Sequence, residues 1–332
     1  MILAGDLGGT KCNLALIEQR DRKFQVLYHH HYSSHSYTNF AAMLTDFLRD
    51  SRDVLDKSSE KVQAAGFGVA GPVLDGSVRL TNLGWNLKGA ELAQQLGVPH
   101  IALLNDLEAT GYSLPWLAPE EMCVINSGTA APQVTRALIA AGTGLGEAIL
   151  RWDDTRYVVE PSEGGHCDFA PRTDQEIELL RYMKKTPGPV AFELILSGRG
   201  FYAIHQFLDP KLTHASFAQG ADAAAPEITE LGLAGTCPTC VETLSIWTAL
   251  YGAEAGNLAL KALARGGVFV AGGIAPKILP KMKDGTFVNA FCEKDKFAEL
   301  LSRIPIQIVL NEEAPLLGAA AEAARLLNLL NQ

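Results

Sequence analysis

The sequence predicts an α/β protein of about two domains. Short apolar runs typical of strands alternate with segments whose apolar residues recur at helical spacing. A length of 332 residues corresponds to roughly two domains of ordinary size. Hydrophobic residues make up 48% of the chain and charged residues 20%, which is the globular range and excludes intrinsic disorder.

The first half of the chain opens on a predicted hairpin. Apolar runs at 2–6 and 12–18 flank the turn Gly8-Gly9-Thr10-Lys11, where glycines let the backbone reverse or approach a ligand closely. A similar strand, turn and strand recur at 137–150, which hints at an internal duplication. Between them we expect a helix at 39–49 with Asn39 as N-cap, a strand at 64–73, a helix at 89–96 and a strand at 100–104.

The second half is more helical. A long helix at 241–265 is expected to break or bend near Gly252 and Gly256. Residues 211–236, rich in Ala, Gly and Pro, form the region with the weakest structural signal. The other expected elements are helices at 174–185 and 189–196, strands at 266–273 and 304–310, and a closing helix at 314–330.

Charge and cysteine content exclude several classes of protein. Lys+Arg 28 against Asp+Glu 37 gives a net charge of -9, so neither nucleic acid nor an anionic membrane is expected as a partner. A bound phosphate would need backbone amides and a metal ion.

Six cysteines are too few for a disulfide scaffold, and neither an export signal nor a transmembrane run is seen. We therefore expect a soluble cytoplasmic protein.

Two glycine-rich turns are candidate phosphate loops. Asp6 stands at the end of the first strand, directly before the first turn, whose amides and Thr10 hydroxyl can hold phosphate. The second is Gly142-Thr143-Gly144. The first turn alone is equally consistent with a plain hairpin, and the second, which fits neither the dinucleotide fingerprint nor the Walker motif, is weak evidence alone. Together they can hold a polyphosphate chain from two sides.

Asn105 and Asp106 follow a buried strand, where α/β sheets present functional groups. An aspartate there can take the proton of a substrate hydroxyl that attacks phosphorus. The alternative is that Asp106 is a helix N-cap, which without the other motifs is the commoner role.

Residues 162–169 gather Glu163, His166 and Asp168 around two glycines. Consecutive residues on a strand point to opposite faces, so His166, Cys167 and Asp168 cannot converge on one metal ion. Glu163 and His166 as hydrogen-bonding partners of a polyol is the better interpretation. Glu193, in a predicted helix, would pass for a solvated surface charge.

Two further groups of residues are weak candidates for metal-binding sites. Cys237-Pro238-Thr239-Cys240 is a single C-x-x-C, and a four-ligand zinc site needs a second pair that the nearby sequence does not supply. We therefore interpret it as a helix start with two free thiols. His29-His30-His31 with His35 fits a solvated edge strand or loop better than a metal site.

Taken together, these segments resemble the bacterial ATP-dependent glucokinases, within the superfamily that also contains hexokinase, actin and the heat-shock chaperone ATPases. The match covers nearly the whole chain, and several motifs in the right order are far more specific than any one alone. One departure is Lys11-Cys12-Asn13, where Asn-Ala-Arg is more usual. The motifs include GDLGGTKCNLAL (5–16), LTNLGW (80–85), LLNDLEATGYSL (103–114), AAGTGLGEA (140–148), SEGGHCDFAPR (162–172), CPTCVETLS (237–245) and GGVFVAGGIAPKIL (266–279).

The resemblance implies a two-domain actin-like ATPase fold, of ribonuclease H-like type, with a deep interdomain cleft. The small domain would comprise residues 1–115 and 311–332, because the chain returns to it after the strand at 304–310, and the large domain 116–310. The cofactor residues implied are Asp6, Gly8, Gly9, Thr10, Gly142, Thr143, Gly144, Gly272 and Gly273. The sugar-binding residues implied are Asn105, Asp106, Glu163, His166 and Glu193, with Asp106 as the base.

The resemblance further implies phosphorylation of D-glucose by ATP to glucose 6-phosphate, feeding glycolysis, by a homodimer. Mg²⁺ is expected mainly through the ATP phosphates. Three alternatives stay open: a kinase for another hexose or an amino sugar, a sugar-sensing regulator without activity, and an actin-like filament former. The regulator is disfavoured because no basic helical segment precedes the first strand, and the filament former because it has no need of the Glu163 and His166 cluster.

Overall fold

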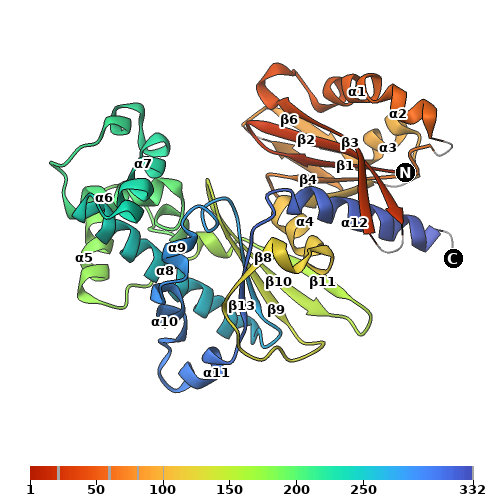
Figure 1. The fold of residues 1–332 in the computed structure, drawn as a ribbon. Coiled ribbons are helices and arrows are strands. Elements are labelled where there is room, and N and C mark those ends of the chain that lie inside the picture. The colour runs from red at the N-terminus through yellow and green to blue at the C-terminus, as the bar shows by residue number, and fades with distance from the viewer. Residues whose placement is uncertain (21–22, 59–60, 81, 100, 331–332) are drawn as a thin grey trace. The chain divides into compact units, whose positions relative to one another are not determined.

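The computed structural model describes residues 1–20, 23–58, 61–80, 82–99 and 101–330, so Thr81 of one motif and His100 of one predicted strand lie outside the described residues. The chain divides into two compact units, Met1–Ala118 with Asn311–Gln332 and Pro119–Leu310. Each unit contains a mixed β-sheet with helices (Figure 1), which confirms the predicted α/β class. Among the described helices, none is both long and apolar enough to span a membrane.

The first unit is built on a five-stranded sheet in the order β3-β2-β1-β4-β7. Strand β1 pairs antiparallel with β2 and parallel with β4, and β4 pairs parallel with β7. A two-stranded sheet, β5-β6, adjoins the same core. The strands are β1 (Ile2–Leu7), β2 (Lys11–Arg20), β3 (Lys23–Ser33), β4 (Ala64–Val69), β5 (Ser77–Leu80), β6 (Trp85–Lys88) and β7 (Ile101–Asn105). The helices are η1 (Ser34–Ser36), α1 (Phe40–Asp50), α2 (Arg52–Lys57), α3 (Gly89–Leu96), α4 (Asp106–Ser113), η2 (Leu114–Trp116) and α12 (Ala314–Leu330).

The second unit has a six-stranded sheet in the order β11-β10-β9-β12-β13-β8. Strand β9 pairs antiparallel with β10 and parallel with β12, which repeats the relation of β1 to β2 and β4 and agrees with the duplicated layout of the sequence. The strands are β8 (Met122–Asn126), β9 (Arg136–Ala141), β10 (Leu145–Trp152), β11 (Tyr157–Ser162), β12 (Val268–Ala271) and β13 (Ile306–Val309). The helices are η3 (Pro119–Glu121), η4 (Gly164–His166), α5 (Asp174–Met183), η5 (Phe192–Leu194), α6 (Gly198–Leu208), η6 (Ala215–Gln219), α7 (Ala221–Ala234), α8 (Pro238–Ala262), α9 (Leu279–Met282), α10 (Thr286–Cys292), η7 (Asp295–Phe297) and α11 (Ala298–Ser302).

Several predicted elements are confirmed closely. Helix α1 begins after Asn39, whose side chain accepts a hydrogen bond from the Ala42 amide, and it buries Phe40 and Phe47. Helices α3 and α12 have the predicted bounds. These segments combine a strong start or stop signal with one apolar face, so local sequence decides their structure.

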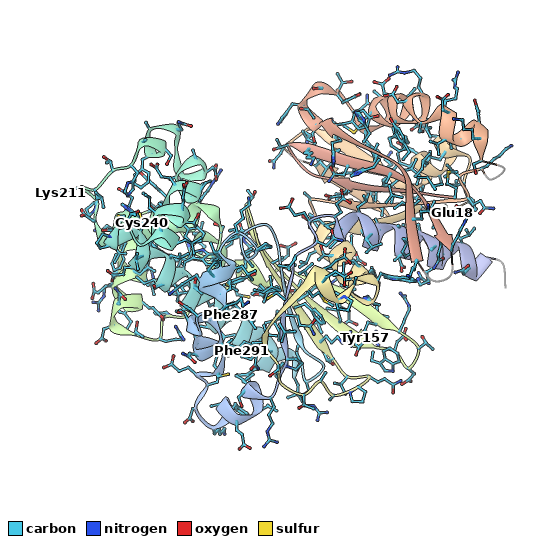
Figure 2. The ribbon with its side chains drawn as sticks, viewed as in Figure 1. Glu18, Tyr157, Lys211, Cys240, Phe287 and Phe291 are labelled. Carbon is cyan, nitrogen blue, oxygen red and sulfur yellow. The ribbon has the colours of Figure 1, made fainter. Side chains whose placement is uncertain are left out.

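The expected break in the long helix is wrong. Helix α8 runs unbroken for 25 residues through Gly252 and Gly256. A Cβ at Gly252 would lie 2.1 Å from the Phe287 carbonyl oxygen, and one at Gly256 would lie 2.6 Å from that of Phe291. Helix α10, which carries both phenylalanines (Figure 2), therefore packs directly on the backbone of α8. The two glycines serve this close packing.

Two other expectations are corrected. Residues 189–196 do not form a helix, because only the single turn η5 is helical there. Residues 211–236 are more regular than expected, since they contain η6 and the 14-residue α7, which ends at Gly235 with φ +69°. Helix α7 packs against α6 and α8, so tertiary contacts stabilise a segment whose composition gives little local signal.

The C-terminal helix completes the first unit. A Cβ at Gly318 would lie 1.7 Å from the Ala109 carbonyl oxygen, and one at Gly66 would lie 2.1 Å from that of Ala319. Helix α12 thus touches the backbones of both α4 and β4. This contact fixes α4, the helix that begins at Asp106.

Candidate functional site

Three polar residues named by the sequence meet at one edge of the first sheet. Asp6 lies near the end of β1. Strand β7 ends at Asn105, and helix α4 begins at the next residue, Asp106. Asp6 is level with Gly68 in the β1–β4 pair, and Asn105 is level with Val69 in the β4–β7 pair. Since these strands are parallel, their carboxyl ends lie at the same edge, the position where α/β sheets bind ligands.

The position of Asp6 in the fold shifts the pKa of its carboxyl group. Burial, and then the nearby Asp106 carboxylate, raises the pKa of Asp6 to about 6. The Asn13 side chain opposes the shift by donating a hydrogen bond from Nδ2 to Asp6 Oδ2 at 3.3 Å. Asp6 and Asp106 therefore form an acidic pair, and oxygen ligands of this kind are the ones that Mg²⁺ prefers, usually with water molecules retained.

The first glycine turn is fixed at one end and open at the other. The Gly8 amide donates to the Lys11 carbonyl at 3.0 Å, and Ser34 Oγ donates to the Gly8 carbonyl at 2.8 Å. A Cβ on Gly8 would lie 2.8 Å from the Lys11 carbonyl oxygen, so a larger residue does not fit. Within the described part of the chain, the amides of Gly9 and Thr10 have no hydrogen-bond acceptor. Those two amides are available to an anion.

Asn105, not Asp106, is the N-cap of α4. Its Oδ1 accepts hydrogen bonds from the amides of Leu107 at 2.9 Å and Glu108 at 3.3 Å, and the Glu108 side chain returns to the Asn105 amide. Asp106 is the first helical residue, and its Oδ1 accepts from the Leu107 amide at 2.8 Å. The alternative that Asp106 caps the helix is therefore wrong. The side-chain amide of Asn105 also donates to the Gly71 carbonyl, and among the described residues its second N–H has no acceptor.

In the second unit, the other two glycine segments follow adjacent parallel strands. Gly142–Gly144 follow β9, and Gly272 and Gly273 follow β12. Gly272 has φ +83°, and a Cβ there would lie 2.3 Å from the Ala141 carbonyl oxygen. A Cβ on Gly273 would meet no atom within 4 Å, and the Thr143 side chain is exposed. The structure thus brings these two loops together at one sheet edge.

Glu193 and His166 lie beside the first of these loops. Glu193 Oε2 accepts a hydrogen bond from the Leu145 amide at 3.0 Å, and its Oε1 lies 3.9 Å from His166 Nε2. A Cβ on Gly144 would lie 2.5 Å from Glu193 Oε2. The His166 side chain is 61% exposed and the Glu193 side chain 31%, so both can reach a ligand. Glu193 is thus anchored at the loop and is no solvated helix charge.

Glu163 stands one turn away from this pair. It precedes η4, and its carbonyl accepts a hydrogen bond from the His166 amide at 3.0 Å. Its side chain is exposed and has no hydrogen-bond partner among the described residues. The predicted residues therefore form two groups. One, in the first unit, holds Asp6, Gly8, Gly9, Thr10, Asn105 and Asp106, and the other, in the second unit, holds Gly142, Thr143, Gly144, Glu163, His166, Glu193, Gly272 and Gly273.

Sequence reasoning missed a buried carboxylate beneath η4. A Cβ on Gly164 would lie 2.1 Å from Glu147 Oε2, so Glu147 supports the turn that carries His166. Burial, and then the neighbouring Glu254 carboxylate, raises the pKa of Glu147 to about 7. Glu254 is fully buried and accepts hydrogen bonds from Asn257 and Lys261. The signal that could have found this pair is a glutamate inside an apolar strand and another inside an apolar helix.

Comparisons with known proteins show relatives that match nearly the whole chain. A family model described as Glucokinase matches residues 3–326. The curated glucokinase of Synechocystis sp. is 38% identical, over 97% of this chain and 98% of its own length. A crystal structure of glucokinase from an Antarctic psychrotroph superposes with a TM-score of 0.85 at 30% identity, with 98% of both chains covered. A ROK family glucokinase from Streptomyces griseus, solved in complex with glucose and AMPPNP, shares the fold at a TM-score of 0.64 and 18% identity, with 98% of this chain and 99% of that one covered.

Proposed function

The chain belongs to the glucokinase family, a family of hexose kinases, and from that premise we propose that it transfers the terminal phosphoryl group of ATP to D-glucose, giving glucose 6-phosphate. The observation that carries the proposal is the acidic pair Asp6 and Asp106 at one sheet edge, next to a turn with two free amides. Phosphoryl transfer depends on positioning and charge stabilisation, and these groups supply both.

We assign the general base to Asp106. When the 6-hydroxyl of glucose attacks the terminal phosphorus, its proton must pass to an acceptor. Asp106 is the first residue of α4, and the Leu107 amide donates to its Oδ1, which orients the carboxylate at the edge of the sheet. The Asn105 cap and the contact of α12 with α4 hold this carboxylate in place.

We assign recognition of the sugar to Asn105, Glu163, His166 and Glu193. A hexose exposes several hydroxyls, and a site that hydrogen-bonds each of them leaves its own polar groups unpaired when an epimer binds. The remaining N–H of Asn105 and the exposed His166 and Glu163 side chains are suited to such contacts. Glu193 has one oxygen engaged by the Leu145 amide and the other near His166, so its orientation is set before a ligand arrives.

We assign the nucleotide to the glycine segments. Gly8, Gly9 and Thr10, and Gly142, Thr143 and Gly144, would hold the phosphates, and Gly272 and Gly273 would lie near the adenosine. AMPPNP in the related Streptomyces structure supports ATP as donor. Mg²⁺ would be held mainly by the ATP phosphates, with Asp6 close to it, and supplies charge neutralisation. An acidic chain needs such a cation at a polyphosphate site.

A coupled assay tests the reaction itself. Purified enzyme is given ATP, Mg²⁺ and a panel of glucose, mannose, galactose, fructose, glucosamine and N-acetylglucosamine, and sugar phosphate and ADP are both measured. We expect the highest kcat/KM with glucose. A parallel series replaces ATP with ADP or polyphosphate, and we expect both to be poor donors. Preference for an amino sugar would replace the substrate assignment, and no turnover with any sugar would overturn the kinase proposal and favour the sugar-sensing regulator.

A further inference from the structure

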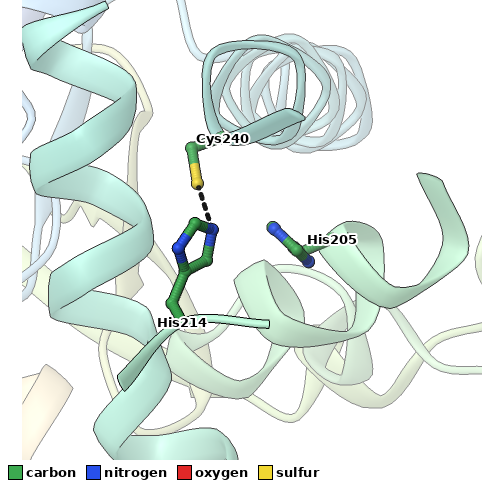
Figure 3. A group of neighbouring side chains, drawn as sticks. All are labelled: His205, His214 and Cys240. Carbon is green, nitrogen blue, oxygen red and sulfur yellow. Dashed lines mark hydrogen bonds between the residues drawn. The ribbon is translucent and has the colours of Figure 1, made fainter. Parts of the chain in front are cut away.

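Four metal-ligating side chains that the kinase reaction does not use lie together in the second unit. Cys237 is the N-cap of α8 and Cys240 lies in its first turn. His205 comes from the last turn of α6, and His214 immediately precedes η6. Figure 3 shows His205, His214 and Cys240 pointing toward one another from these three segments. The second ligand pair that the C-x-x-C lacks in the sequence is thus supplied by the fold.

The ligand atoms of His205, His214 and Cys240 are spaced to fit one small ion, and Cys237 lies outside that group of three. His214 Nε2 lies 3.3 Å from Cys240 Sγ and 3.8 Å from Cys237 Sγ. The nearest ligand atoms of His205, His214 and Cys240 all lie within 4.8 Å of one another. A tetrahedral zinc ion with Zn–S of about 2.3 Å and Zn–N of about 2.0–2.1 Å places its nitrogen and sulfur ligands about 3.6 Å apart. His205, His214 and Cys240 therefore need only a small adjustment, and a movement of the Cys237 side chain toward them completes the site.

His205 gives an independent indication of a ligand. Its side chain is completely buried, and neither Nδ1 nor Nε2 has a hydrogen-bond partner among the residues that the structure describes. Buried polar atoms are nearly always partnered, so an imidazole with two unpaired nitrogens calls for an explanation. Its ring contacts are with His214 and Phe217, at centroid separations of 5.2 Å and 5.0 Å. A metal ion bound to His205 would satisfy one of these nitrogens.

We propose that Cys237, Cys240, His205 and His214 bind a structural zinc ion. Two thiolates and two imidazoles are a donor set typical of tetrahedral zinc, and a site closed by four protein ligands leaves no open position for catalysis. Binding Zn²⁺ releases the two thiol protons to solvent, so the ion is held by two thiolates and two neutral imidazoles. No oxidation or reduction is involved.

The position of the zinc site suggests what it stabilises. It ties the end of α6 and the segment before η6 to the start of α8. At the other end of α6, the Gly198 amide donates to the Gly142 carbonyl at 2.9 Å, in the second glycine loop. Zinc bound at His205 would hold the helix on which that loop rests. We therefore expect metal removal to lower the thermal stability of the enzyme.

A second group of metal-ligating side chains could also bind zinc, so the experiment needs a variant that lacks this group. His29, His31 and Glu313 also bring their ligand atoms within 4.8 Å of one another, but His31 and Glu313 are exposed and on the surface of the first unit. The double variant His29→Asn/Glu313→Gln removes this cluster. Cys292→Ser is a matched control for loss of a half-buried thiol outside the zinc site.

The test is metal content by inductively coupled plasma mass spectrometry on tag-free protein that has been grown with zinc and gel-filtered in metal-free buffer. We expect about one zinc per chain in the wild type, in His29→Asn/Glu313→Gln and in Cys292→Ser. Cys240→Ser and His205→Asn should lose at least tenfold in zinc affinity. Zinc that persists in Cys240→Ser, or that disappears only in His29→Asn/Glu313→Gln, would overturn the proposal.

A second measurement does not depend on whether the variants fold. Wild-type enzyme stripped of metal is titrated with Co²⁺, which should give the visible bands of tetrahedral cobalt and a thiolate-to-cobalt charge-transfer band, both saturating at one equivalent. Absence of these bands would overturn the proposal. So would a Cys237–Cys240 disulfide, found by mass spectrometry in protein purified under reducing conditions.

Discussion

The side chain of Asn13 donates a hydrogen bond to Asp6 across the β1–β2 pair, from Nδ2 to Oδ2 at 3.3 Å. The amide oxygen of Asn13 is in turn hydrogen-bonded to Nδ1 of His31 on β3. Asn13 lies in the segment 11–13, where the resemblance implies other residues, and its hydrogen bond opposes the rise in the pKa of Asp6. Asn13 therefore acts directly on the proposed phosphate site.

The first prediction concerns this contact. Replacing Asn13 by leucine removes the hydrogen bond that favours ionised Asp6, so the Asp6 pKa should rise above about 6. If ionised Asp6 is needed near the Mg²⁺–ATP phosphates, the acid limb of the kcat/KM profile should move to higher pH, by roughly half a unit. The check is the pH profile of kcat/KM for ATP. Gln19→Leu, on the same strand, is the control, and an unmoved limb in Asn13→Leu contradicts the role of Asp6.

The second prediction concerns Asp106. Asp106→Asn preserves shape but cannot accept the hydroxyl proton, and loss of a general base typically lowers kcat by about 10²–10⁴. The KM for glucose should change little. The matched control is Asp174→Asn, because Asp174 is likewise the first residue of a helix behind an N-cap, Thr173 of α5. Steady-state kinetics of both variants decide the question, and near-normal turnover by folded Asp106→Asn would move the search for the base to Glu163.

The third prediction follows from the buried Glu147. Its pKa is raised to about 7 in the folded enzyme from an ordinary value of 4.5, so the folded state binds the proton more tightly than the unfolded state does. The stability that protonation provides is complete below about 4.5 and is lost as pH rises through about 7. Glu147→Gln should remove that loss, up to about 3 kcal/mol.

Urea unfolding at pH 5.5 and pH 8 measures this effect in the wild type and in Glu147→Gln. Asp6 and Glu108, whose pKa values are also raised by burial, leave a residual pH dependence in both proteins. The expected result is a smaller difference between the two pH values in the variant. Equal differences in the two proteins would show that Glu147 ionises as freely when folded as when unfolded.

The fourth prediction concerns the contact of α8 with α10. Gly252→Ala places a Cβ 2.1 Å from the Phe287 carbonyl oxygen, so backbone must move, and overpacking of this kind costs about 1–3 kcal/mol or more. Gly89→Ala is the control, since its Cβ would meet nothing nearer than 3.5 Å and alanine favours a helix. Thermal unfolding should show a lower Tm for Gly252→Ala alone. An unchanged Tm would mean that α10 is not packed this closely.

Most of the helices and strands, and most residues of the candidate site, could be predicted from the sequence. Helix α1 was predictable because the Asn39 cap and its apolar face are local signals, and Asp6 and Asp106 were predictable because each stands at the end of an apolar strand. Two kinds of error had one cause. The expected break at Gly252 and the expected helix around Glu193 both relied on local propensity. In the structure, α10 packs on the backbone of α8 at Gly252, and the Leu145 amide binds Glu193, around which only the single turn η5 is helical.

By itself, the sequence determined the alternation of strands and helices, the acidic charge and the positions of the glycine turns, because these depend on residues near one another in the chain. Only the tertiary structure decided which side chains meet. It brought Asn13 to Asp6 through strand pairing, placed Glu147 beneath Gly164, and joined His205 and His214 to Cys240 from three separate segments. Such encounters depend on how distant segments pack to bury apolar surface, and no local spacing encodes them.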